Sequence, residues 1–304
     1  MNATRTTGEP GARADEGPGP LPLTWLYVPG DRPDVVTKAL ASGADVVLID
    51  LEDAVAPERK AYALDATAEL LGDPRPGPVP VHVRVNSLSG PLAGEEVRRL
   101  AALPGLAGLR LPKVDTVTDV VRVAQQARGA VPSPPSGGRG TVPGLYPLLE
   151  SALGIEHAYA IATAHPSVRG IALGESDLRA VLGVTGDDGL AWPRSRAVVA
   201  ARAAGLAPPP QSVYPDVADT AGLARSCARG RSLGFLGRTA IHPAQLEIIE
   251  RAYLPTRQEI EEAEEIVKAA AADAGALALP DGRFVDAAIV AGAQRTLALA
   301  RRRR

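Results

Sequence analysis

The chain has 304 residues, of which 45% are hydrophobic and 22% are charged, and its formal net charge is -2. This balance argues against a nucleic-acid-binding or anionic-membrane-binding protein, and no apolar stretch is long and uninterrupted enough to span a bilayer. The single cysteine, Cys227, excludes an internal disulfide and a cysteine zinc site, which fits a cytoplasmic protein.

Residues 1–20 are rich in glycine, proline, alanine and charge. They contain no apolar stretch of the kind found in a signal peptide. We expect this segment to be disordered, because it lacks the apolar residues that would hold it in a packed structure.

From Thr24 onward, short apolar runs alternate with stretches of helical composition. Several runs are apolar nearly throughout, which is typical of parallel strands covered on both faces. We count eight predicted strands: Trp25–Val28, Val46–Leu51, Val79–Val85, Leu106–Val114, Leu145–Leu149, Val168–Leu173, Gln211–Tyr214 and Phe235–Ile241.

Eight strand–helix units over roughly 230 residues match a (β/α)8 barrel in size, so we predict an α/β barrel domain over residues 21–252. A doubly wound open sheet is the main alternative. It would usually carry a glycine-rich nucleotide fingerprint after its first strand, and Pro29–Pro33 does not have that pattern.

Three segments fall outside the repeat. Pro132–Gly140 is predicted to be a flexible loop, and Arg179–Pro193 lengthens the connection after the sixth strand, where a barrel enzyme could carry a lid. Residues 253–304 form a helical extension that the barrel does not need. We expect this extension to pack on a neighbouring subunit or to cover the active face.

Polar side chains gather at the carboxyl ends of the predicted strands, where barrel enzymes place their catalytic groups. All eight ends carry charge or imidazole, whereas polar residues are sparse inside the runs. In chain order the residues are Arg32, Glu52, Asp53, Arg84, Asn86, Lys113, Glu150, Asp177, Tyr214, Asp216 and His242.

Glu150 and Asp177 follow the fifth and sixth predicted strands, so they would be neighbours. Two bare carboxylates repel each other, and a divalent cation held between them relieves the repulsion. Oxygen ligation with few protein ligands suits Mg²⁺, whose waters Glu52 and Asp53 could hold. The alternative is a structural ion pair that joins Glu150 to Arg84 or Lys113.

Three other strand-end residues have more than one interpretation. Arg84 offers a rigid fork of donors suited to a carboxylate or an enolate oxygen. Lys113 could form a Schiff base, but an amine beside several acids stays protonated, which favours an electrostatic role. His242 could be a base, a helix-capping residue or a substrate contact.

These residues lie in a set of motifs that resembles the citrate lyase β-subunit-like branch of the HpcH/HpaI aldolase family, the CoA-ester lyases. The resemblance covers about Leu23 to Leu299. The motifs are Tyr27–Pro33, Gly43–Val55, Val83–Asn86, Leu111–Val114, Leu149–Ser151, Gly174–Leu178, Val213–Asp216 and Ile241–Gln245.

The resemblance implies a TIM barrel of the phosphoenolpyruvate/pyruvate type with Mg²⁺, or Mn²⁺, on Glu150 and Asp177. It implies that Arg84 contacts the substrate and that the loop containing Pro29, Gly30 and Arg32 helps to hold CoA. We also place Lys113 and His242 among the substrate-binding residues. The resemblance further implies a homotrimer or hexamer.

In related lyases an aspartate from a neighbouring subunit's C-terminal segment reaches the active site, and Asp286 occupies the matching position. We therefore assign Arg84, Glu52, Asp53 and Asp286 to the catalytic group.

The expected reaction is cleavage or formation of a 3-hydroxyacyl-CoA of malyl- or citramalyl-CoA type, with acetyl-CoA and a 2-oxo acid as the products of cleavage. Malate-synthase-like or thioesterase activity, a CoA-independent aldolase and a non-catalytic acyl-CoA binder are the alternatives. Leu153 replaces an arginine that the family often has, which leaves the acid substrate open.

Overall fold

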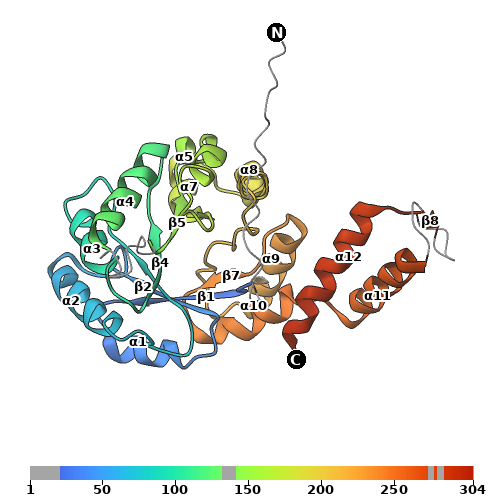
Figure 1. Cartoon of the computed structure of the whole chain (residues 1–304), viewed down its shortest axis with the longest axis horizontal. Coiled ribbons are helices and arrows are strands. Elements are labelled where there is room, and N and C mark those ends of the chain that lie inside the picture. The colour runs from blue at the N-terminus through green and yellow to red at the C-terminus, as the bar shows by residue number, and fades with distance from the viewer. Residues whose placement is uncertain (1–20, 132–141, 273–276, 279–283, 304) are drawn as a thin grey trace, which may run out of the picture.

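Seven parallel strands form one curled sheet with helices around its outside (Figure 1). The computed structural model describes residues 21–131, 142–272, 277–278 and 284–303. Strand order in the sheet is β6-β5-β4-β3-β2-β1-β7. The bounds are β1 Thr24–Pro29, β2 Val46–Asp50, β3 Val81–Arg84, β4 Leu106–Leu111, β5 Gly144–Leu149, β6 Ala172–Leu173 and β7 Arg238–Ala240.

The prediction of a TIM-barrel-type α/β fold is confirmed, but the prediction of eight strands is wrong within the described residues. Gln211–Tyr214 contributes only an isolated bridge from Gln211 to Arg238. The run is preceded by Pro208–Pro210 and followed by Pro215, and proline has no N–H with which to extend a ladder. In the described residues β6 and β7 are therefore the two edge strands of the sheet, and they are not paired with each other.

Helices connect the strands in the pattern that the sequence predicts. The sheet is surrounded by α1 Pro33–Leu40, α2 Lys60–Leu71, α3 Ala93–Leu100, α4 Val117–Ala130, α5 Ala152–Glu156, α6 Ala158–Ala162, α7 Glu175–Leu182, α8 Ala191–Ala203, α9 Thr220–Ser232 and α10 Leu246–Tyr253. Short 3-10 turns are η1 Pro57–Arg59, η2 Asp187–Leu190 and η3 Pro243–Gln245. The predicted loop at Pro132–Gly140 lies outside the described residues.

Side chains on the strands alternate between two environments. One set, with Val47, Val83 and Leu109, packs against the surrounding helices in the main apolar core. The other set points into the barrel and contains aromatic and charged residues, such as Trp25, His82 and Arg110, beside a few aliphatic ones. Alternation along each strand therefore separates an apolar outer layer from a polar barrel interior.

The barrel interior contains a ring cluster of Trp25, His82 and Tyr146. The Trp25 and His82 rings lie 5.3 Å apart, and the His82 and Tyr146 rings lie 4.6 Å apart. A Cβ at Gly108 would lie 2.7 Å from the Tyr146 ring and 2.8 Å from His82, so this position needs a glycine.

Beyond the barrel, the chain forms an arm of two helices, α11 Arg257–Ala272 and α12 Ala287–Ala300, with a short hairpin of β8 Leu277–Ala278 and β9 Phe284–Val285 (Figure 1). Arg302, just past α12, contacts Asp45 and the carbonyl of Leu21, which lie at the amino ends of the strands. The arm is thus anchored on the face opposite the strand ends that carry the predicted site.

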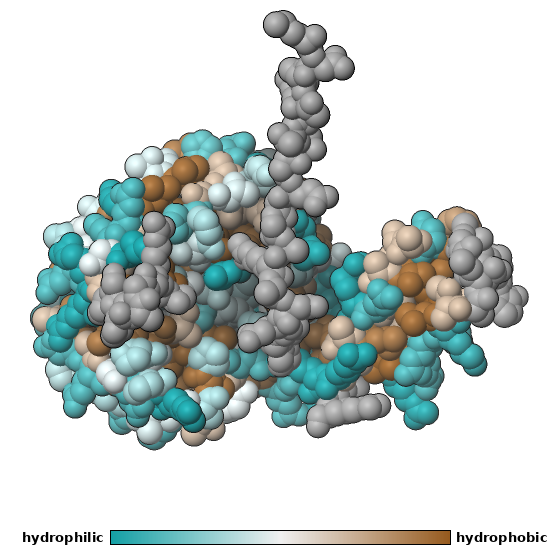
Figure 2. Space-filling model, viewed as in Figure 1, coloured by the Kyte–Doolittle hydropathy of each residue, from teal (hydrophilic) through white to brown (hydrophobic). Residues whose placement is uncertain are grey.

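Apolar side chains are visible along the arm in Figure 2, and Phe284 and Ile289 are exposed. Packing of residues 253–304 on another subunit remains a prediction, and residues 1–20 lie outside the described part. Among the helices of the described residues, none has the length and apolarity needed to cross a membrane.

Candidate active site

The carboxyl ends of the strands surround a cavity of about 370 Å³. Glu150 and Asp177 line this cavity and also an adjoining one of about 470 Å³ that Lys113 borders. The structure therefore brings together the two acids that the sequence assigned to a metal. The larger set around the first cavity includes Tyr27, Asp50, Asp53, Arg84, Arg110, Ser212 and Thr239.

Glu150 is a buried acid whose position is fixed by backbone. It follows β5, and its Oε1 accepts a 2.6 Å hydrogen bond from the backbone N–H of Lys113. Lys113 has a positive φ of 51°, a left-handed backbone conformation that is uncommon for residues other than glycine. A Cβ at Gly174 would collide with the Glu150 carboxylate, so glycine is required there.

Burial is the main cause that raises the pKa of Glu150 to about 8, together with the nearby charges of Glu52 and Asp177 and against the opposing effects of the Lys113 N–H and Arg84. Within the described residues, Glu150 makes no ion pair. The alternative that it pairs with Arg84 or Lys113 is wrong, because both cations are taken by other acids. Glu150 is thus an acid that still needs a cation.

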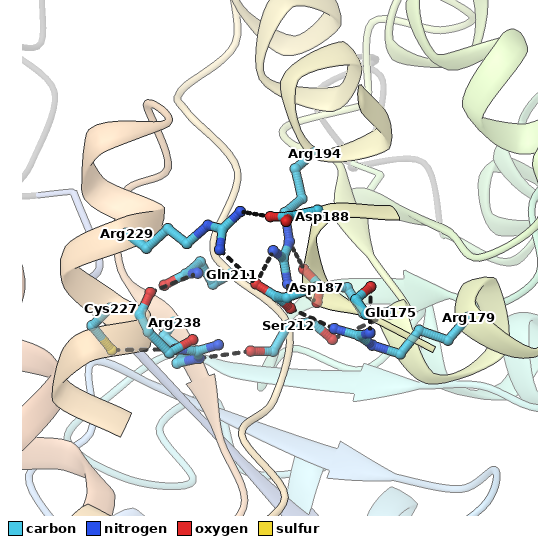
Figure 3. A network of polar contacts seen from close by, with 12 residues as sticks. Glu175, Arg179, Asp187, Asp188, Arg194, Gln211, Ser212, Cys227, Arg229 and Arg238 are labelled. Atoms are coloured by element: carbon cyan, nitrogen blue, oxygen red, sulfur yellow. Dashed lines mark hydrogen bonds and ion pairs between the residues drawn. The ribbon is translucent and has the colours of Figure 1, made fainter. Parts of the chain in front are cut away.

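Asp177 lies in the first turn of α7, and an ion-pair network holds this helix in place (Figure 3). The buried guanidinium of Arg194 donates two hydrogen bonds to Glu175, at 2.9 and 2.6 Å, and also donates to Asp187 at 2.7 Å. The hydrogen bond from Arg194 is the main cause that lowers the pKa of Asp187, to about 2. This network fixes the start of the helix that presents Asp177 to the cavity.

The segment that the sequence predicted as a lid is helical and ion-paired. Its residues belong to the end of α7, η2 and the start of α8. Arg179 donates to Asp187 at 2.5 Å, and Arg229 of α9 donates to Asp188 at 2.8 Å, as Figure 3 shows. The network is a brace between α7, α8 and α9.

Arg84 occupies the other side of the cavity. Its Nε and Nη2 donate to the two Asp50 oxygens at 2.8 and 2.6 Å, and its Nη1 lies 3.0 Å from Glu52. Its guanidinium also lies over the Tyr27 ring at 4.9 Å. Burial opposes the charge, but the hydrogen bond to Asp50 and the surrounding acids outweigh it and raise the pKa of Arg84.

Lys113 and Asp53 complete this group. The Lys113 ammonium donates to Glu52 at 3.0 Å, and this bond raises the pKa of Lys113. A protonated amine is a poor nucleophile, so the structure disfavours the Schiff-base interpretation. Asp53 lies 3.5 Å from Arg84, with 61% of its side chain exposed.

The loop after β1 lies against the end of β2. The Gly30 N–H donates to the Asp50 carbonyl at 2.9 Å, and a Cβ on Gly30 would lie 2.8 Å from the Leu51 side chain. Pro29 ends β1, and Arg32 is exposed at the start of α1. Arg32 is therefore free to meet a ligand above the barrel.

His242 and Asp286 both cap helices. The Nδ1 of exposed His242 accepts from the Ala244 N–H at 3.2 Å, which is the capping role that the sequence left open. Asp286 Oδ1 accepts from the Ile289 N–H at 2.9 Å, at the outer end of α12. Figure 1 places that end of the arm away from the barrel, so Asp286 does not join the cavity of its own chain.

The sequence reasoning missed Asp50 and Arg110. Asp50 fixes Arg84, and its carboxylate also accepts from the N–H groups of Glu52 and Ala54 at 2.8 and 3.0 Å. Arg110 lines the cavity from β4. Each is a single charge inside an otherwise apolar strand, and that pattern would have identified both residues.

The residues present fit a magnesium ion. No group of three close histidine, cysteine, aspartate or glutamate residues occurs in the described part of the chain. Mg²⁺ needs only one or two protein carboxylates, because waters and substrate fill its other positions. A buried glutamate next to a second acid is the donor set that such an ion stabilises.

The chain matches known proteins along most of its length. The family model described as HpcH/HpaI aldolase/citrate lyase matches residues 23–243, and a model for carbon–carbon bond lyases of the TIM-barrel fold matches residues 201–286. A (3S)-malyl-CoA thioesterase of Cereibacter sphaeroides is 34% identical over 281 residues, which cover 90% of this chain and 93% of the relative.

Two further relatives bear on the site. Citrate lyase subunit beta of Escherichia coli is 32% identical over 285 residues, covering 91% of this chain and 92% of the relative. The crystal structure of CitE from Mycobacterium tuberculosis, in complex with magnesium, acetoacetate and coenzyme A, has a TM-score of 0.76 and 29% identity, covering 93% of this chain and 98% of that one.

Proposed function

The chain belongs to the HpcH/HpaI aldolase/citrate lyase family, and we propose that it is a Mg²⁺-dependent lyase acting on a 3-hydroxyacyl-CoA of malyl- or citramalyl-CoA type. The family makes it a carbon–carbon lyase of CoA esters. The products of cleavage would be acetyl-CoA and a 2-oxo acid. The observation that carries the proposal is the buried pair of Glu150 and Asp177 beside Arg84 in one cavity.

Glu150 and Asp177 would hold the cation, and the magnesium in the CitE complex supports this assignment. Mn²⁺ could replace Mg²⁺, since it accepts the same oxygen ligands. When bound, the ion supplies Lewis-acid polarisation of the oxygens of the 2-oxo acid. Asp53 lies at the exposed edge of the cavity, where it could orient water, whereas Glu52 positions Arg84 and Lys113.

Arg84 would stabilise the thioester enolate that forms when the carbon–carbon bond breaks. Asp50 accepts hydrogen bonds from Nε and Nη2 of Arg84, and Nη1 forms ion pairs with Glu52 at 3.0 Å and Asp53 at 3.5 Å. The second hydrogen of Nη2 would then be available to an oxygen in the cavity. A donor held in place before the reaction stabilises developing charge without reorganisation. The acids around Arg84 thus hold its guanidinium in a fixed orientation before the substrate binds.

Asp286 of a neighbouring subunit would move the proton on the acetyl methyl group. Its place at the outer end of the arm supports this role, because the arm extends away from its own barrel (Figure 1). The exposed loop of Pro29, Gly30 and Arg32, with Lys113 and His242, would hold CoA. A homotrimer or hexamer in the cytoplasm remains part of the proposal.

Thioesterase activity is the second candidate, and the (3S)-malyl-CoA thioesterase relative favours it. A lyase converts malyl-CoA to acetyl-CoA and glyoxylate, whereas a thioesterase releases malate and free CoA. Product analysis with a thiol reagent and chromatography of the CoA esters separates the two outcomes.

The Asp177→Asn variant tests the metal site. We expect a loss of Mg²⁺-dependent cleavage of at least about 1000-fold in kcat/KM, because the neutral amide removes one of the two negative charges that would hold the ion. The matched control is Asp34→Asn, an exposed aspartate on α1, which should keep wild-type turnover. Near wild-type kcat/KM in a folded Asp177→Asn protein would refute the assignment.

A further inference from the structure

Arg110 is a buried cation for which the chain supplies no counter-ion. It lies on β4, is 2% exposed, and neither its Nε nor its Nη2 has a hydrogen-bond partner. No ion pair joins Arg110 to any acid in the part of the chain that the structure describes. Buried charges in proteins are almost always paired, so this one calls for an explanation.

Two aromatic rings contact the Arg110 guanidinium, but they do not neutralise its charge. Its guanidinium lies over the rings of Trp25 and Tyr146 at 5.3 and 5.9 Å. Burial lowers its pKa, yet an arginine side chain keeps its proton in proteins, so the charge remains. His82 offers no negative charge, because burial and the charge of Arg110 hold its pKa at about 3 and leave it neutral.

The acids that could pair with Arg110 are engaged elsewhere. In the β3–β4 register Arg84 lies opposite Arg110, and the Asp50 carboxylate is bound to Arg84. Glu52 contacts Arg84 and Lys113. The two neighbouring arginines therefore differ, since one is neutralised by the chain and the other is not.

Arg110 and Glu150 line the same cavity of about 370 Å³ without forming an ion pair. The cavity thus offers an uncompensated acid on one side and an uncompensated cation on another. A ligand of matching polarity presents a cation to Glu150 and Asp177 and an anion to Arg110. A divalent ion with a bound carboxylic acid has this polarity.

We infer that Arg110 binds a carboxylate of the acid substrate inside the barrel, opposite the Glu150–Asp177 pair. The inference rests on the proposed function and extends it to a residue within β4. The carboxylate is either the one next to the oxo group or a second one farther along the acid. The chemistry is the same for both, because guanidinium and carboxylate form charge-assisted hydrogen bonds.

The test uses Trp25, whose ring lies next to Arg110, as the reporter. The chain has two tryptophans, and Trp192 is 57% exposed on α8, so Trp192→Phe leaves Trp25 as the only tryptophan. Tryptophan fluorescence is titrated with pyruvate, which has one carboxylate, and with fresh oxaloacetate, which has two, at saturating Mg²⁺. The same titrations are run on Arg110→Met and Arg110→Lys.

We expect Arg110→Met to weaken acid binding by about 10- to 100-fold, the range for charge-assisted hydrogen bonds. Arg110→Lys should retain part of the affinity. Arg169→Met, an exposed arginine beside Tyr146, is the matched control and should bind both acids like the parent. Weakening of both acids assigns Arg110 to the carboxylate next to the oxo group, and weakening of oxaloacetate alone assigns it to the second carboxylate.

Stability distinguishes recognition from a structural role. Removing an unpaired buried charge should raise the Tm of ligand-free Arg110→Met by about 2 °C or more, whereas a structural arginine would lower it. Unchanged affinity of Arg110→Met for both acids overturns the inference while the proposed function stands. If the parent protein binds neither acid with Mg²⁺, the proposed function itself fails.

Discussion

The two sides of the cavity differ in how their charges are satisfied. On the paired side, Asp50, Glu52, Arg84 and Lys113 meet opposite charges at 2.6 to 3.0 Å. On the open side, Glu150 and Arg110 are buried without an ionic partner in the described chain. The charges of the paired side are met within the chain, whereas on the open side a ligand would supply the missing charges.

Asp50→Asn tests the paired side and has the largest expected effect. It leaves Arg84 with Glu52 and the exposed Asp53 as its remaining acids. We therefore expect the free energy of unfolding to fall by about 3 kcal/mol, the lower end for a broken buried pair. Urea unfolding followed by circular dichroism measures it. The matched control is Asp65→Asn, whose 2.6 Å pair with Arg99 is exposed and should be worth less than about 1 kcal/mol. Equal losses of unfolding free energy in Asp50→Asn and Asp65→Asn would contradict the prediction that the buried pair is the stronger one.

The pH dependence of Mg²⁺ binding tests the open side. Glu150 has a pKa of about 8 in the folded chain against 4.5 for the free group, so the folded state holds an extra proton between these values. Stability of the metal-free protein therefore contains a contribution that falls as pH rises from 4.5 to about 8.

Mg²⁺ binds the ionised form of Glu150, so its affinity should rise by about tenfold per pH unit well below pH 8, or about 1.4 kcal/mol. Calorimetric titration at pH 6 and pH 7 measures this slope. Glu150→Gln should remove both the slope and the metal binding. A slope that survives in Glu150→Gln would assign the proton to another group.

Asp53→Asn has the smallest expected effect on stability. Its side chain is 61% exposed and 3.5 Å from Arg84, and exposed pairs contribute less than about 1 kcal/mol. Urea unfolding should show a change within this limit. A loss several times larger would place Asp53 within the paired side, while the activity of the same variant tests its predicted catalytic role.

The sequence predicted most of the sheet, and it failed where local pattern and tertiary pairing disagree. Val46–Asp50 and Leu106–Leu111 were recognisable because continuous apolar runs are typical of strands covered on both faces. Gln211–Tyr214 has the composition of a strand, but the flanking prolines limit it to one bridge.

By itself, the sequence determined that acids and cations gather at the carboxyl ends of the strands, because each one directly follows an apolar run. Only the tertiary structure decided which of these charges pair. Strand register brings Arg84 opposite Asp50, and the turn at Lys113 gives Glu150 a backbone N–H instead of a cation. A charge is neutralised only by a group within a few ångströms, and such distances between strands depend on register and burial rather than on order along the chain.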